Sequence, residues 1–247
     1  MKNLTALIGL EFKLNLRFFM VVFFALAFPV LMLLLFGGIY GNEPTPFFGG
    51  YGSVDVSVPA YMSMVIAVTG IMTLPLNLAN YRERKILKRF MATPIRIYDL
   101  LISQVVVNII FTCLGVLLLV VVGMLVFNMQ IIGNVLMISI AFLISLLSMF
   151  ALGFIIASLC TNVRTASLVA NLIYFPMVFL TGATIPLEIM PGYMVTISKA
   201  LPLSYVVSLQ KGIWLGGNLF DHTTELAVLL AIFIAGILIS VKSFRWV

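Results

Sequence analysis

The chain has 247 residues, of which 63% are hydrophobic and 9% are charged, and its formal net charge is +6. Soluble domains carry about 25% charged residues, so this composition excludes a soluble globular domain, and it equally excludes a disordered or fibrous chain. Because a spanning helix needs about 20 apolar residues, the chain has room for about five to seven membrane spans and for no large soluble domain.

Residues 1–17 precede the first long uncharged run and mix apolar with polar side chains. Glu11, Lys13, Asn15 and Arg17 alternate with other residues, so they do not share one face of a helix. The segment is predicted to be either an N-terminal helix in the membrane interface or an ordered entry to the first span.

Uncharged runs predict six transmembrane helices, and the expected fold is therefore an all-α polytopic membrane protein with a single transmembrane domain over 1–247. The run from 100 to 163 is too long for one span, and the polar residues near 128–134 supply a turn that divides it into two. The predicted spans cover about residues 18–40, 59–79, 101–127, 135–160, 166–184 and 222–241.

The charges divide unequally between the two sides of such a bundle. Six spans place both termini on one side, together with twelve Lys or Arg residues and three Asp or Glu residues. The other side holds two Lys residues and five Asp or Glu residues. The sums are +9 (12 − 3) and −3 (2 − 5), which together give the net charge of +6. The positive-inside rule predicts cytoplasmic termini, and the charge reflects topology rather than nucleic-acid binding.

The connection between the second and third spans predicts a short amphipathic helix over about residues 81–92, which ends before Pro94. Its apolar face carries Ile86, Leu87, Phe90 and Met91. The basic residues, mostly on the opposite face, are Arg84, Lys85, Lys88 and Arg89. From the residues alone, this helix is either a basic anchor on anionic lipid headgroups or a rigid element that docks into a cytoplasmic partner.

The stretch from 181 to 216 is apolar enough for membrane depth, but Pro186, Pro191 and Pro202 cut it into pieces too short to cross. This pattern predicts re-entrant or interfacial half-helices over about residues 185–216. Broken backbone at membrane depth must be covered by protein or line a wet cavity. The alternative is an outer interfacial loop that serves packing alone.

Catalytic chemistry is not indicated by any pattern in the chain. There is no Gly-x-x-x-x-Gly-Lys-Ser/Thr loop and no visible Ser/His/Asp arrangement, and one His with two separated Cys residues predicts no metal site. The centres of the predicted spans carry no charge, which argues against a proton-driven carrier but not against sodium coupling.

The polar residues inside the spans are amides and hydroxyls, which either join helices by hydrogen bonds or line a cavity. Asn77, Asn108 and Asn171 are the candidates for cavity lining. Pro29, Pro75 and Pro176 are expected to kink their helices, since proline removes a backbone hydrogen bond.

Two segments carry a family resemblance. One is Tyr81-Arg82-Glu83-Arg84-Lys85 with the following Leu87, Phe90 and Ala92-Thr93-Pro94. The other is Phe179-Leu180-Thr181-Gly182-Ala183-Thr184-Ile185-Pro186, followed by Met190-Pro191 and Leu201-Pro202-Leu203-Ser204-Tyr205. With six spans and no nucleotide-binding domain, the chain resembles the membrane (permease) subunit of a type-2 ATP-binding-cassette exporter of the bacterial multidrug or antibiotic-resistance kind.

The resemblance assigns roles to these segments. The first would be the coupling helix that docks on the ATPase, and the second would form two outer half-helices that gate the outer side. The implied coupling residues are Arg82, Glu83, Arg84, Lys85, Leu87, Lys88, Arg89 and Phe90. The implied outer-gate residues are Gly182, Pro186, Pro191 and Pro202.

The resemblance also implies the function. The chain would export an amphiphilic substrate (a drug, an antibiotic, a peptide or a lipid-like molecule) across the bacterial cytoplasmic membrane. It would not be an enzyme, because ATP and Mg would be bound by a separate cytoplasmic ATPase subunit. Its other partners would be a second copy or a paralogue of the permease and membrane lipid. Two rival interpretations remain: a secondary carrier driven by an ion gradient, and a non-transporting scaffold or sensor subunit.

Overall fold

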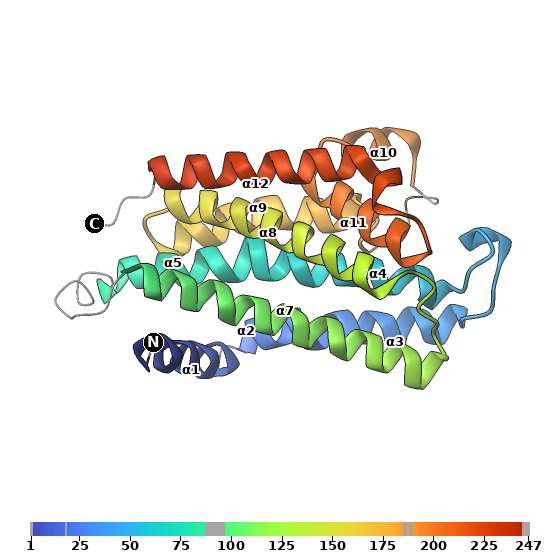
Figure 1. Ribbon diagram of the computed structural model, residues 1–247, viewed down its shortest axis with the longest axis horizontal. Coiled ribbons are helices and arrows are strands. Elements are labelled where there is room, and N and C mark those ends of the chain that lie inside the picture. Colours follow the sequence, from blue (N-terminus) through green and yellow to red (C-terminus); the bar gives the residue numbers. More distant parts are fainter. Residues whose placement is uncertain (1, 18, 87–96, 185–186, 188–189, 244–247) are drawn as a thin grey trace.

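The computed structural model describes residues 2–17, 19–86, 97–184, 187 and 190–243. Within these residues every regular element is helical, and six helices are long and apolar enough to cross a membrane. The prediction of an all-α chain with six spanning helices is therefore confirmed. The long helices lie side by side along one axis, and both ends of the chain lie at the same end of the bundle (Figure 1).

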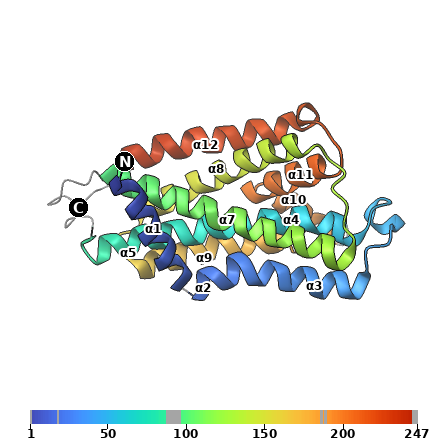
Figure 2. The same cartoon turned by 60° about the horizontal axis from the view of Figure 1, so that its bottom comes forward.

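The N-terminal elements are α1 (Lys2–Arg17) and the first spanning unit, which consists of α2 (Phe19–Val22), η1 (Phe23–Ala27) and α3 (Phe28–Tyr40). Figure 2 shows α1 running obliquely across α7 rather than along the bundle axis. A helix in this orientation covers the end of the bundle and does not extend the first span.

The second spanning unit consists of α4 (Ser53–Ala67), η3 (Val68–Thr73) and α5 (Leu74–Glu83). It begins earlier than the predicted residue 59 because the side-chain oxygen of Asn42 accepts hydrogen bonds from the backbone N–H groups of Val54, at 3.0 Å, and Asp55, at 3.2 Å. These bonds satisfy N–H groups that a helix start otherwise leaves free. The charged residue Asp55 thus lies inside the first helical turn.

The remaining elements surround this second unit. They are α7 (Ile97–Phe127), α8 (Val135–Leu159), α9 (Val163–Leu180), α10 (Gly192–Ser198), α11 (Pro202–Trp214), η5 (Leu219–His222) and α12 (Thr223–Ser243), and a short turn η2 (Pro46–Phe48) precedes α4. In the second unit, 83% of the residues in its most apolar stretch are buried. In the last spanning helix, the corresponding share is 17%. The α4–η3–α5 unit is therefore the centre of the bundle, and α12 lies at its edge.

Two spanning units contain a widened π-helical turn, η1 and η3, and each turn comes shortly before a proline, Pro29 or Pro75. Proline has no N–H for the regular i to i−4 bond, and its ring collides with the preceding turn. The chain accommodates this by a π turn, a distortion that recurs at functional sites. The expected distortion at Pro29 and Pro75 therefore takes the form of a local widening.

Between α9 and α12 the chain forms two short helices, α10 and α11. Pro191 precedes the first turn of α10, and Pro202 is the first residue of α11, where its missing N–H costs nothing. The apolar side of α11 is buried, including Leu203 and Trp214, and it packs against α4 and α8. Protein thus covers α11, whereas α10 is largely exposed, including Tyr193 and Ile197, and the re-entrant character of the segment stays a prediction.

Candidate functional site: a groove between α5 and α9

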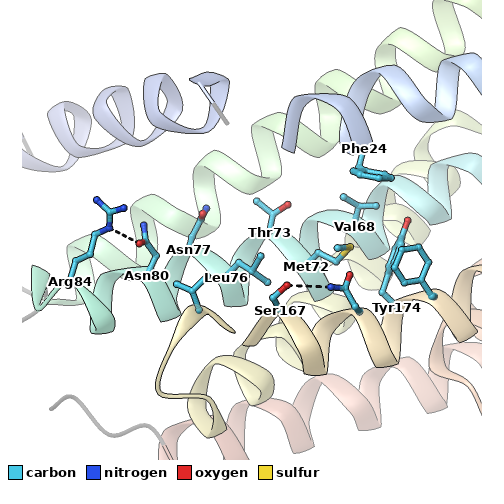
Figure 3. A pocket seen from close by; sticks show the side chains of 13 residues that line it. Phe24, Val68, Met72, Thr73, Leu76, Asn77, Asn80, Arg84, Ser167 and Tyr174 are labelled. Carbon is cyan, nitrogen blue, oxygen red and sulfur yellow. Dashed lines mark hydrogen bonds between the residues drawn. The ribbon is translucent and has the colours of Figure 1, made fainter. Parts of the chain in front are cut away.

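A groove of about 600 Å³ runs between the η3–α5 segment and α9 (Figure 3). Ligand pockets in proteins have volumes of about 300–1,000 Å³. The groove extends from the end of the bundle that carries both chain termini towards its middle. Its lining residues are Phe24, Val68, Met72, Thr73, Leu76, Asn77, Asn80, Arg84, Val163, Ser167, Asn171, Tyr174 and Phe175.

The polar lining residues form two stripes with helical spacing. Residues at i, i+4 and i+7 lie on one face of a helix. Thr73, Asn77, Asn80 and Arg84 follow this spacing on the η3–α5 segment. Ser167, Asn171 and Tyr174 follow it on α9. Both stripes contribute to the lining, but in the view of Figure 3 the polar side chains of η3–α5 lie on the side of that segment away from Ser167, and Leu76 lies between the two helices.

Within each stripe, a hydrogen bond connects two side chains of the same helix. The Nε of Arg84 donates to Oδ1 of Asn80 at 2.9 Å, and Nδ2 of Asn171 donates to Oγ of Ser167 at 3.2 Å. These bonds orient the side chains without joining the two walls.

The inner part of the groove is apolar and aromatic. Phe24 reaches it from η1, Val68 and Met72 come from η3, and Phe175 comes from α9. The hydroxyl of Tyr174 is buried and has no hydrogen-bond partner among the described residues. Both π turns contribute lining side chains, so the widened helix geometry occurs at the groove.

A clamp of Arg82 and Glu83 holds the end of α5 against the α8–α9 turn. Arg82 donates through Nη1 to the carbonyl oxygen of Ala157 and to that of Cys160, the latter at 2.9 Å. Oε2 of Glu83 accepts from the backbone N–H of Val163, the first residue of α9, at 2.8 Å. A carboxylate at this position accepts a hydrogen bond from an N–H group at the helix start, and its negative charge interacts favourably with the positive end of the helix dipole. The two walls of the groove are thus joined at their termini-bearing end.

An adjoining side of α5, which shares Asn77 with the groove, forms a buried polar network with α1 and α7. Glu11 accepts hydrogen bonds from the Tyr81 hydroxyl and, at 2.5 Å, from Nε2 of Gln104. Nδ2 of Asn77 donates to Oδ1 of Asn15 at 3.1 Å and to Oε1 of Gln104 at 3.3 Å. Since Asn77 also lines the groove, it connects the two polar regions.

Glu11 is 3% exposed, and no ion pair to it occurs within the described part of the chain. Burial raises the pKa of its carboxyl above the ordinary value of 4.5, against the lowering effect of the hydrogen bonds from Tyr81 and Gln104. Loss of hydration disfavours the ionised form more than the hydrogen bonds favour it. The network therefore favours a protonated Glu11 over a wider pH range than a carboxyl in water.

The structure places the predicted coupling residues in different settings. Arg82 and Glu83 form the clamp, Arg84 lines the groove, and Lys85 is exposed with a positive φ of 55°. The other four predicted residues, Leu87, Lys88, Arg89 and Phe90, lie outside the described residues. Their docking role stays a prediction.

Of the three asparagines predicted to line a cavity, Asn77 and Asn171 line the groove. Asn108 does not line it: this residue is fully buried on α7, where its Nδ2 donates to the carbonyl oxygen of Gln104 at 2.8 Å. Its Oδ1 is buried and has no hydrogen-bond partner among the described residues.

The predicted outer-gate residues flank the short helices α10 and α11. Gly182 follows α9 with a φ of 82°, a conformation that favours glycine, and a Cβ there would lie 3.0 Å from Cγ of Leu187. Pro191 and Pro202 begin the two short helices. Pro186 lies outside the described residues, so the gating role of this group stays a prediction.

Sequence reasoning missed Glu11, Tyr81 and Gln104 as a unit, and it missed Asn80, Ser167 and Tyr174 as groove residues. The spacing of 73, 77, 80 and 84 and that of 167, 171 and 174 was a readable signal for the stripes. No local pattern identifies the Glu11 network, because its members come from three distant segments.

The groove lining suits the binding of a molecule with polar and apolar parts. Among the described residues, no group of three or more His, Cys, Asp or Glu side chains could hold a metal ion. The lining combines amides, hydroxyls, aromatic rings and one guanidinium group. Such a surface can hold and release a molecule that has both polar and apolar parts.

Known proteins with similar sequences are membrane transporters. The chain is 24% identical over 163 residues to the probable multidrug ABC transporter permease YbhS of Escherichia coli (strain K12), which covers 66% of this chain and 43% of that relative. It is 22% identical over 158 residues to the probable multidrug ABC transporter permease YbhR of the same strain, covering 64% and 43%. The matched region thus spans less than half the length of these relatives.

The family model of the ABC-2 type transporter matches residues 2–213. This region contains α1, the first five spanning helices, the groove, the clamp and both short helices α10 and α11. A match over so much of the chain assigns the fold and the family together. The chain therefore belongs to the ABC-2 type transporter family.

Proposed function

We propose that the chain is the transmembrane subunit of an ABC exporter, and that it moves an amphiphilic substrate across the bacterial cytoplasmic membrane with ATP hydrolysed by a separate subunit. The groove between α5 and α9 is the single observation that carries this proposal. It has the mixed polar and apolar lining that an amphiphile needs, and its polar end lies beside the segment proposed to meet the ATPase.

A second copy or a paralogue of the chain would complete the substrate pathway. The groove is open along one side of a single bundle, so a lone copy leaves a bound molecule facing lipid. Large apolar side chains on α9, Leu168, Leu172, Phe175 and Phe179, are exposed beside it. Pairing of two such faces would enclose the two grooves between the subunits and bury these side chains.

The clamp supplies the mechanical link in this proposal. Residues 81–92 would dock on the cytoplasmic ATPase, which would bind ATP and Mg. Because Arg82 and Glu83 tie α5 to the α8–α9 turn, a push on this segment would move both walls of the groove together. The groove would then open and close between two subunits rather than between α5 and α9 of one subunit.

The topology follows from the charge distribution. The end of the bundle with both termini carries most of the Lys and Arg residues, so it would face the cytoplasm in a multi-pass arrangement. An interfacial position of α1 fits its oblique course across that end. Substrate would enter the groove from this side and leave near α10 and α11.

A pull-down of the tagged chain in mild detergent from its native host tests the proposal. We expect a near-stoichiometric soluble partner with a phosphate-binding loop, and ATP hydrolysis in the eluate. A chain that purifies alone under several gentle conditions, and that transports in response to an ion gradient without ATP, would support a secondary carrier. Unchanged export in a strain without the chain would support a scaffold or sensor subunit.

A further inference from the structure

The charge of the groove is one-sided. Arg84 is the one charged residue among the described residues that line it, and no acidic side chain faces it from either wall. The neighbouring acid, Glu83, is engaged on the backbone N–H of Val163. An unbalanced cation at the mouth of a binding groove favours an anionic ligand group.

Arg84 is also held in a suitable geometry. Its Nε donates to Asn80 at 2.9 Å, while the guanidinium group is exposed and forms no ion pair within the described ranges. This arrangement leaves the terminal N–H groups free to point at a ligand. A guanidinium group binds carboxylate, sulfonate and phosphate oxygens in a two-point manner that an ammonium group does not match.

The rest of the lining determines which end of the groove would hold the polar part of a ligand and which end its apolar part. Beyond Arg84 come the amides of Asn77, Asn80 and Asn171, and then the aromatic and apolar end around Phe24 and Phe175. The wall from Val68 to Arg84 extends about 24 Å at ~1.5 Å per residue, the length of an extended molecule with a head and an apolar tail.

We propose that the groove binds an amphiphile with an anionic head, which Arg84 holds at the mouth while the apolar part lies towards Phe24. The inference rests on the proposed function and names its substrate class. The occupant is a mobile molecule that enters from the basic end of the bundle, and not a resident lipid of the bilayer. A negatively charged head is required for tight binding; a positively charged head is disfavoured by Arg84.

The test measures binding to the full chain alone in nanodiscs of zwitterionic phosphatidylcholine, so it does not depend on an ATPase. The probes are radiolabelled dodecanesulfonate and dodecyltrimethylammonium below their micellar concentrations, which share a tail length and differ in head charge. We expect the sulfonate to bind at least about tenfold more tightly, since one charge-assisted hydrogen-bonded pair accounts for such a factor. Equal binding of the two probes would overturn the proposal without any variant being made.

Two substitutions that each remove one positive charge distinguish binding in the groove from non-specific attraction to the protein surface. Arg84→Gln is expected to weaken sulfonate binding about tenfold, and Arg84→Lys to restore part of it. The matched control is Arg164→Gln, because Arg164 is an exposed arginine near the same end of the bundle that does not line the groove. Equal losses in Arg84→Gln and Arg164→Gln would show non-specific attraction and would overturn the site.

A resident lipid is distinguished by adding phosphatidylglycerol to the nanodiscs. The proposal expects the Arg84-dependent sulfonate binding to persist at tenfold lipid excess, whereas complete displacement would assign the site to an anionic lipid headgroup and overturn the proposal. The proposed function fails separately, in the pull-down. Arg84-dependent binding in a chain that purifies without an ATPase would leave the ligand site in place and reject the ABC export role.

Discussion

The α5 helix has two polar sides that are built from similar residue types and differ in what they face. On one side Tyr81 and Asn77 join Glu11, Asn15 and Gln104 in a buried network. On the other side, Asn80 and Arg84 face an open groove. The side chains on the first side form hydrogen bonds with α1 and α7. The second side keeps its polar groups available, which is what a binding surface requires.

This difference predicts that the network controls stability and that the groove controls binding. An unsatisfied buried donor costs about 1–3 kcal/mol, whereas an exposed polar group can turn to water. Substitutions on the two sides of the same helix should therefore separate the two properties. Asn77 is the exception, because it belongs to both sides.

The largest effect is expected for Glu11→Ala. The substitution leaves the Tyr81 hydroxyl without its acceptor and removes one of the two acceptors of Gln104 Nε2, and we expect a loss of about 2 kcal/mol in the free energy of unfolding. Thermal unfolding in detergent, followed by circular dichroism or by size-exclusion chromatography, measures it. Lys13→Ala, an exposed change on the same helix, is the control. Equal unfolding temperatures for both variants would contradict a structural role of the network.

An intermediate effect is expected at the clamp. Glu83→Ala removes the acceptor of the Val163 N–H but leaves the N-cap residue Asn162 in place, and it should lower the free energy of unfolding by about 1 kcal/mol. In the proposed transporter it should also uncouple ATP hydrolysis from transport, because the two walls no longer move together. Arg84→Gln, which leaves the clamp intact, should keep the stability of the native chain.

A second variant separates the clamp from the docking segment. Phe90→Asp is expected to uncouple transport while membrane insertion stays intact, and Glu83→Arg should do the same with an added loss of stability. Transport and ATP hydrolysis, measured on the same vesicles, show whether the two are coupled in each variant. If Phe90→Asp and Glu83→Arg both transport normally, the coupling role of this segment is wrong.

A smaller effect is expected from the protonation of Glu11. The folded chain raises the pKa of this carboxyl above 4.5, so the folded state binds a proton more tightly than the unfolded state does. The contribution of Glu11 to stability is then fully present below pH 4.5 and is lost as the pH rises through the higher pKa of the folded chain. The unfolding temperature of the native chain should fall over this window relative to that of Glu11→Gln. Parallel pH curves would contradict the burial effect.

The smallest effect is expected for Tyr174→Phe. This change removes a buried hydroxyl that has no partner among the described residues, so stability should stay the same or rise by up to about 1 kcal/mol. Thermal unfolding measures it against Tyr205→Phe, which loses a hydrogen bond to the carbonyl oxygen of Lys199 at 2.9 Å on an exposed part of the chain. A clear loss of stability in Tyr174→Phe would show that its hydroxyl has a partner.

The fold could be predicted from the sequence better than the site could, because the fold depends on local features and the site on contacts between distant segments. The six spans and the division of the 185–216 stretch by prolines were readable, since hydropathy and proline act within a few residues, whereas the sequence left the role of residues 1–17 open. Helix ends were less readable: α4 begins at Ser53 because Asn42, outside the helix, caps it. The two polar stripes were visible as spacing, but not the fact that they line one groove.

The sequence by itself determined that this chain is a helical membrane protein with an uneven distribution of charge, because span length and hydrophobicity are properties of local composition. Tertiary structure alone decided which polar residues are satisfied and which are available. Glu11 and Gln104 are 93 positions apart in the chain, and Arg82 and Cys160 are 78 apart. An acid or a guanidinium group becomes part of a network, a clamp or a binding groove only through neighbours that the packing of distant helices brings to it.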